Sequence, residues 1–240
     1  MTNFKHNFSK ISLLAQQNII FKDDEKRSFE LIPMSVSNLY LNESLIWFLN
    51  FLDQDVEELQ KFFPSVEITN HYKFMTLVLT LAEKKKELQE LADLFLEALE
   101  VILPNIHFKQ KVLFLGDISV NESLFNLIID VIFMVLDRKP KIVINEDDDE
   151  MTKRMKQKQK KVEEIKRKGK KQNINTTSFE DMFAALLYEY PQYKLQDLFE
   201  LNIYTFHFLF KYIGKIANYE VSKIAAGNGL AKKHKYFIEK

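Results

Sequence analysis

The chain has 240 residues, 46% of them hydrophobic, which suits one large domain or two small ones with a buried core. Cysteine is absent, which excludes disulfides, thiolate metal ligands and cysteine nucleophiles. The formal net charge is zero, and the scarcity of glycine and proline, five of each, favours long helices over a strand-rich sandwich.

The first 39 residues have a mixed character. Residues 18–21 and 28–32 are short runs with strand-like composition, and the polar segment 22–27 lies between them. This arrangement predicts a β-hairpin. Pro33 follows the second run directly, and because proline cannot donate a ladder hydrogen bond, we expect that run at the edge of its sheet.

Two helical stretches are expected next. Asn42 is the predicted N-cap of a helix that runs to about Phe63, since the apolar residues between them follow helical spacing. A second helical stretch begins near Asn70 and is stopped by Pro104, with a bend compatible with the lysines at 84–86.

Strands and a further helix complete this part of the chain. Residues 106–115 alternate loosely and end at the turn pair Gly116-Asp117, which predicts one or two short strands. A strong apolar stripe over 121–137 predicts the third long helix.

The charge changes abruptly at residues 146–171. Five acidic residues at 146–150 are followed by 151–171, which holds eleven Lys/Arg and two Glu. Such a run is either a solvated single helix or disordered. We therefore expect a mainly α fold with minor β, divided into a helical N-terminal domain, a charged connector and a small C-terminal helical unit. The predicted limits are 1–144, 145–176 and 177–240.

The C-terminal block begins with a capping pattern. Thr177 and Glu180 fit a capping box, and the helix that follows should end before Pro191. A short helical turn at 195–199 and a long helix from 204 to about 226 are expected after it.

No reaction chemistry is apparent in the sequence. The five histidines form no pair at helical ligand spacing, the glycines are isolated, and the acids at 146–150 lack the glycine and distal glutamate of a calcium loop. We therefore expect no catalytic residue, cofactor or metal, and no enzyme. The apolar stretch 124–136 is too short to span a bilayer, and the first residues lack a signal-peptide pattern, so a cytoplasmic location is expected.

The last long helix is the candidate partner surface. Apolar side chains lie nearly all round its start, and a helix of that kind is buried or docks a partner. The stripe Phe206, Phe210 and Ile213 is expected to face a small C-terminal core. The offset stripe, expected to face outward or toward a partner, is Tyr204, Phe208 and Tyr212.

The basic run is the candidate electrostatic contact. It favours a solvated helix or linker, with contact to RNA, DNA or an acidic protein surface as the alternative. Aromatic residues that would stack on bases are missing from 151–171. The candidate contact residues are Lys153, Arg154, Lys156, Lys160, Lys161, Arg167 and Lys168.

Two segments of the C-terminal block carry a family resemblance. Residues 179–182 read Phe-Glu-Asp-Met, the helix they open ends in Tyr-Pro, and residues 194–206 read Lys-Leu-Gln-Asp-Leu-Phe-Glu-Leu-Asn-Ile-Tyr-Thr-Phe. Over about 179–230 this pattern resembles the C-terminal part of tail assembly chaperones of tailed bacteriophages that infect low-GC Gram-positive hosts. The resemblance implies a helical N-terminal domain, a charged linker, a helical tail domain and no catalytic residues.

The expected function follows from that resemblance. The family coats the tape-measure protein and helps recruit tail-tube subunits, which implies a chaperone that shields hydrophobic helical segments in the host cytoplasm. The alternatives are a structural component of the phage particle and a nucleic-acid-binding regulator that uses 153–171.

Overall fold

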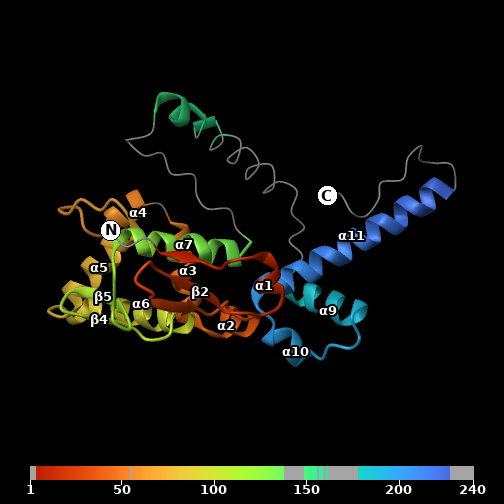
Figure 1. The fold of residues 1–240 in the computed structure, drawn as a ribbon, viewed down its shortest axis with the longest axis horizontal. Helices are drawn as coiled ribbons and strands as arrows, with labels where there is room; N and C mark the ends of the chain where they lie inside the picture. Colours follow the sequence, from red (N-terminus) through yellow and green to blue (C-terminus); the bar gives the residue numbers. More distant parts are fainter. Residues whose placement is uncertain are drawn as a thin grey trace.

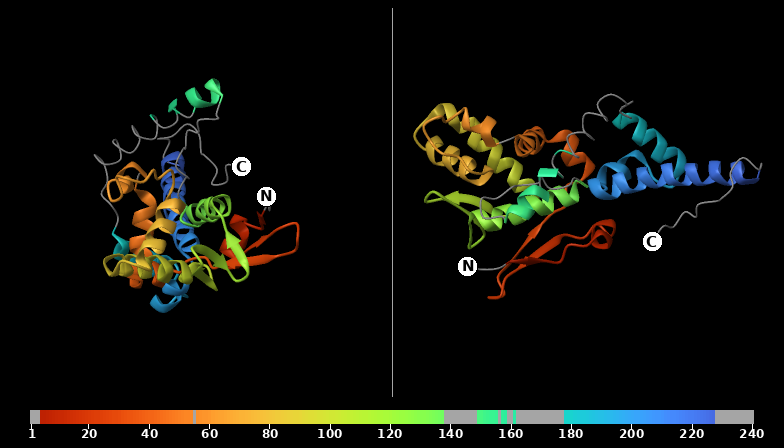
Figure 2. Two further views of the ribbon diagram at one scale, coloured as in Figure 1. Left: turned by 90° about the vertical axis from the view of Figure 1, so that its left-hand side faces the viewer. Right: turned by 90° about the horizontal axis from the view of Figure 1, so that it is seen from above.

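The computed structural model describes residues 4–54, 56–137, 149–155, 157–158, 161 and 178–227. The described chain is mainly helical, with two small three-stranded antiparallel sheets (Figure 1), as the composition predicts. The helices α3 (Glu43–Asp53), α5 (His71–Ala82), α6 (Gln89–Ile102) and α7 (Glu122–Val135) gather with the sheets in one body (Figures 1 and 2). Helix α11 (Ile203–Gly227) extends from the other end of the molecule.

The first sheet confirms the predicted hairpin and adds a strand to it. Its strands, in the spatial order β1-β2-β3, are β1 (Lys5–His6), β2 (Ile19–Lys22) and β3 (Ser28–Leu31). Strand β3 lies at an edge, where Pro33 costs no ladder bond. The short helix α1 (Lys10–Leu14) connects β1 to β2 and was not predicted, because five residues are too few to show a helical period.

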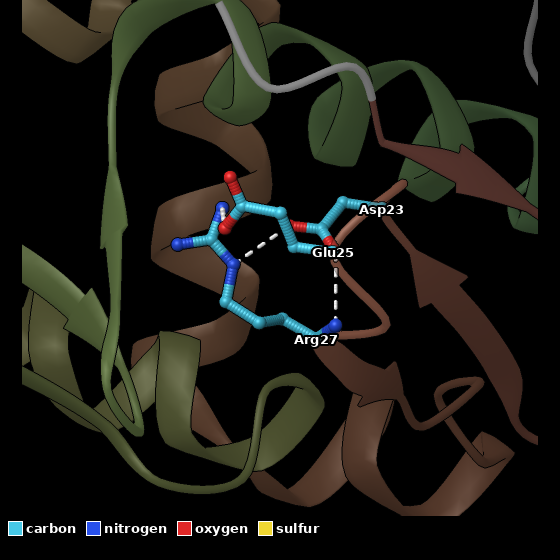
Figure 3. A network of polar contacts seen from close by, with 3 residues as sticks. All are labelled: Asp23, Glu25 and Arg27. Carbon is cyan, nitrogen blue, oxygen red and sulfur yellow. Dashed lines mark hydrogen bonds and ion pairs between the residues drawn. The ribbon is translucent and has the colours of Figure 1, made fainter.

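The loop between β2 and β3 is closed by one buried carboxylate (Figure 3). The backbone N–H of Arg27 donates to Asp23 Oδ1 at 2.8 Å, and its Nε donates to Asp23 Oδ2 at 2.7 Å. The Arg27 guanidinium also pairs with Glu25, 3.1 Å from Nη2 to Oε2. The side chain of Asp23 has no exposed surface, so these bonds replace the water that it loses.

The helices of the body differ from the prediction at two places. The stretch expected from near Asn70 to Pro104 is two α-helices and not one bent helix, since the first ends at Ala82 and the second begins at Gln89. Asn42 caps its helix as expected, with the backbone N–H of Leu45 donating to Asn42 Oδ1 at 2.7 Å. The predicted helix 42–63 is nevertheless wrong, because Gln54 is extended and separates two helices. After the break, Leu59 lies in the core. The helices here are α2 (Val36–Leu41), α3 (Glu43–Asp53), α4 (Val56–Gln60), α5 (His71–Ala82), η1 (Lys86–Leu88), α6 (Gln89–Ile102) and α7 (Glu122–Val135).

The second sheet contains two strands within 106–115, as expected, and a third strand that was not predicted after the Gly116-Asp117 turn. Its strands are β4 (Ile106–Lys109), β5 (Val112–Leu115) and β6 (Ile118–Val120), in that spatial order. Gly116 opens the β5–β6 turn with a φ of 58°, a value that glycine adopts without steric cost. The β4–β5 turn has Gln110 at φ 51° and Lys111 at φ 65°, so two residues with side chains are left-handed there.

The core of the body is built on α6, which packs against both α3 and α5. Its Phe95 contacts aromatic rings of both helices edge to face, among them Phe51 at 5.0 Å and Trp47 at 5.2 Å between ring centres. The abundance of phenylalanine in the sequence is therefore used for the core.

Three helices follow the connector: α9 (Phe179–Glu189), α10 (Leu195–Glu200) and α11 (Ile203–Gly227). The predicted capping box is wrong by one residue. Ser178 is the N-cap, and it exchanges hydrogen bonds with Asp181 at 3.1 and 3.2 Å. The reason is that Ser178 still has an extended backbone, so the helix begins after it, and Thr177 lies outside the described residues.

These helices do not form a small core of their own. A β-bridge joins Ser35 to Asn202. The N–H of Val36 donates to the Leu201 carbonyl at 2.8 Å, and the N–H of Ile203 donates to the Met34 carbonyl at 2.9 Å. The described parts of 1–144 and 177–240 thus share one apolar core, contrary to the expectation for the C-terminal unit.

Only the beginning of the basic connector is described. Asp149 accepts hydrogen bonds from the backbone N–H of Thr152 at 2.7 Å and from its hydroxyl at 2.9 Å, which starts a short helical segment at 150–155. The limits predicted for the connector, 145–176, remain a prediction because most of it lies outside the described residues.

Candidate partner-binding surface

The start of α11 is fixed by Asn202. This buried side chain donates through Nδ2 to the Leu13 carbonyl at 2.6 Å and accepts at Oδ1 from the backbone N–H of Thr205 at 2.8 Å. Its own backbone N–H donates to Oε1 of Gln16 at 2.9 Å. Asn202 therefore caps α11 and ties it to the end of α1. Sequence reasoning missed this role, although an asparagine directly before a helix is a recognisable capping signal.

An aromatic cluster holds α9 between α2 and α11. The ring of Phe179 lies 3.7 Å from that of Tyr40 and 4.9 Å from that of Phe206, and Phe183 lies 5.0 Å from Phe206. Burial, together with the charge of Glu180, raises the pKa of the Tyr40 hydroxyl to about 12. Phe206 is fully buried, as its predicted inward orientation requires.

Tyr204 does not belong to an outward stripe. Only 8% of its surface is exposed, so its predicted outward position is wrong. Burial and the charge of Asp137, just after α7, raise the pKa of its hydroxyl. Lys211, two turns further along α11, forms an ion pair with the same Asp137. Asp137 thus lies beside this part of α11, and the sequence of α11 alone contains no sign of that neighbour.

The other two predicted residues are exposed and lie together. Phe208 is 40% exposed and Tyr212 is 37% exposed, and their rings stack at 6.0 Å with an interplanar angle of 20°. Ile216, one turn further on and 37% exposed, continues the row. We call Phe208, Tyr212 and Ile216 the α11 stripe. Their i, i+4, i+8 spacing places them on one side of the helix.

The second half of α11 extends away from the body (Figures 1 and 2). Two further apolar side chains are exposed there, Val221 at 65% and Ile224 at 62%. Gly214 lies near the middle of α11, and a Cβ built on it would meet nothing within 4 Å. Glycine costs helix stability of roughly 1 kcal/mol relative to alanine, and no contact within the described chain requires it at this position.

The predicted electrostatic residues are only partly described. Lys153 is half-buried, while Arg154 and Lys161 are exposed, and Arg154 pairs with Glu150 at 3.7 Å. The other candidates lie outside the described residues, namely Lys156, Lys160, Arg167 and Lys168. Their contact with a nucleic acid or an acidic protein therefore remains a prediction.

The described residues give no support to binding of two other kinds, to a metal ion or across a membrane. Among them, no three His, Asp or Glu side chains come together as a metal site would require. No described helix is both long and apolar enough to cross a membrane. Comparison with protein-family models, curated proteins and solved structures found no match to this chain. The case for a function therefore depends on the geometry of α11 and on the sequence pattern around it.

Proposed function

We propose that this chain is a non-enzymatic tail assembly chaperone that binds hydrophobic helical segments of a phage tape-measure protein in the host cytoplasm. The observation that carries the proposal is the α11 stripe, a row of exposed apolar side chains on a helix whose first residues are buried in the core and whose described second half extends away from the body. The sequence pattern of 179–206 supports the same function.

The form of the stripe suits a helical partner. An amphipathic helix docks by placing side chains at i, i+3 and i+4 against a matching apolar row. Phe208 and Tyr212 are aromatic, and aromatic anchors supply a large share of the binding energy in protein interfaces. A tape-measure helix lying along α11 would cover these rings and could continue toward Val221 and Ile224.

Phe208→Asp is the direct test. The variant should melt close to the parent chain by circular dichroism, because an exposed apolar site loses little on substitution. It should weaken binding of the co-expressed tape-measure protein by about thirtyfold or more, since an aromatic anchor contributes about 2 kcal/mol or more.

Two controls make the result specific. Tyr188→Asp changes an aromatic residue that is 83% exposed on the neighbouring helix α9, and it should leave binding unchanged. Phe206→Asp places a charge in the core and should unfold the protein. Equal capture of the tape-measure protein by the parent chain and Phe208→Asp would contradict the proposed surface.

Whether the chain is present in the mature phage particle distinguishes a chaperone from a structural component. A chaperone leaves when the tube has assembled, so mass spectrometry of purified particles should not detect the chain. Its presence at the copy number of a tail protein would favour the structural alternative.

A further inference from the structure

A shallow pocket on the first sheet is lined by two lysines and lies apart from the α11 stripe. Its volume is about 260 Å³, and its lining comes from the neighbouring strands β1 and β2 and the residue after β1. The lining residues are Lys5, His6, Asn7, Ile20 and Lys22.

Two of these residues form an unfavourable pair. Lys5 and Lys22 are direct partners across the antiparallel strands β1 and β2. Like charges directly opposite each other destabilise a sheet. Neither ammonium group forms an ion pair with a carboxylate in the described part of the chain. The nearby carboxylate of Glu30 accepts instead from Nδ2 of Asn18, at 3.0 Å.

Of the two other polar residues, Asn7 supplies a side-chain donor and His6 does not. Oδ1 of Asn7 accepts from the backbone N–H of Ile20 at 2.8 Å, which leaves the Nδ2 group as its donor. The ring of His6 lies on the opposite face of the sheet from Lys5 and Lys22, with its centre 5.7 Å from that of the buried Phe21 ring. Two ammonium groups and an amide therefore remain at the pocket.

We propose that this pocket binds the phosphate group of a small molecule whose apolar part lies over Ile20. A phosphate oxyanion offers only acceptors and carries the negative charge that would offset the Lys5–Lys22 repulsion. Ile20 is a partly exposed apolar lining residue and supplies the contact for the rest of the ligand. The site is independent of the proposed chaperone function.

Phenyl phosphate is a suitable probe, with inorganic phosphate and phenol as its separate halves. Titration followed by amide NMR should shift the Ile20 backbone signal and the Asn7 side-chain signals. Phenyl phosphate should bind more tightly than inorganic phosphate, and phenol should not bind. Shifts of equal size with sodium chloride at matched ionic strength would overturn the proposal.

Substitution of Lys22 should weaken ligand binding and raise the melting temperature of the free protein. Lys22→Gln should weaken phenyl phosphate binding by about tenfold, because it removes one charge-assisted hydrogen bond. Without ligand, the same variant should melt about 2 °C higher, since the like-charge pair is gone.

Lys109→Gln is the matched control, because it changes an exposed strand lysine in the second sheet. It should affect neither the binding nor the melting temperature. Unchanged binding by the double variant Lys5→Gln/Lys22→Gln would rule out the site.

Discussion

Asp23 illustrates how much of a local structure can depend on one side chain. Burial by itself would raise the pKa of its carboxyl, but hydrogen bonds from Arg27 and the positive charge of that guanidinium outweigh burial and lower it. The ionised form is therefore favoured by folding, and the β2–β3 loop (Figure 3) is held most firmly when Asp23 is charged.

This lowered pKa predicts a pH dependence. A carboxyl whose folded pKa is depressed adds stability above its unfolded pKa, near 3.8, and that stability is lost as the pH falls through the folded value. Arg27→Gln should therefore melt at a lower temperature than the parent chain at pH 7. The difference between the two melting temperatures should become smaller toward pH 2. Glu25→Gln, which alters an exposed carboxylate in the same loop, should show a much smaller gap. A gap that does not change with pH would contradict this role of Asp23.

Asn202 predicts a large effect from a small substitution. Asn202→Ala removes the acceptor for the Thr205 N–H and the Nδ2 donor to the Leu13 carbonyl, all in a buried position. The Leu13 carbonyl keeps the Thr205 hydroxyl and the Gln16 N–H as donors, so the main loss is the acceptor of the buried Thr205 N–H. This should cost about 2 kcal/mol in the free energy of unfolding, measured with urea. Asn218→Ala on the exposed part of the same helix should stay within about 0.5 kcal/mol of the parent.

At the scale of elements, local signals predicted most of the fold. The hairpin at 18–32 and the cap at Asn42 depend on neighbouring residues, so the sequence shows them. The inward position of Tyr204 depends on the elements that pack on the start of α11, and α1 and α2 among them lie far away in the sequence, so no periodicity within α11 reveals it. The break at Gln54 is not marked by a proline or a glycine, so the apolar spacing alone predicts a continuous helix there.

The β4–β5 turn offers a stabilising change. Its central residues, Gln110 and Lys111, both have positive φ, the geometry that Asn-Gly adopts most readily. Gln110→Asn/Lys111→Gly should raise the free energy of unfolding by about 1 kcal/mol, because a left-handed residue with a Cβ costs about that much. Thermal melting would measure the gain. The reverse change at the β5–β6 turn, Gly116→Ala, should lower the melting temperature.

At the scale of the whole molecule, the described N-terminal and C-terminal parts form one apolar core together. The strand-like contact between Ser35 and Asn202 joins segments on either side of the basic connector. Two parts that share a core in this way need no intact connector to stay together, because the contacts that hold them are noncovalent.

Limited trypsin digestion tests this arrangement. The density of Lys and Arg in 153–171 predicts first cuts there, and the two fragments should then elute together in gel filtration under native conditions. They should separate only in denaturant. Fragments that elute apart without denaturant would show that the shared core is too weak to hold them. First cuts within 40–140 would instead argue against the exposed connector.

The hydrogen bond between Leu13 and Asn202 spans 189 positions of the chain, and this distance affects biosynthesis. Ribosomes add roughly 5–20 residues per second, so about 10–40 seconds pass between the synthesis of the first residue and that of its partner. During that interval Leu13, Met34 and Val36 lack the segment that covers them in the finished protein. The nascent chain must therefore stay soluble with part of its core uncovered until its last quarter leaves the ribosome.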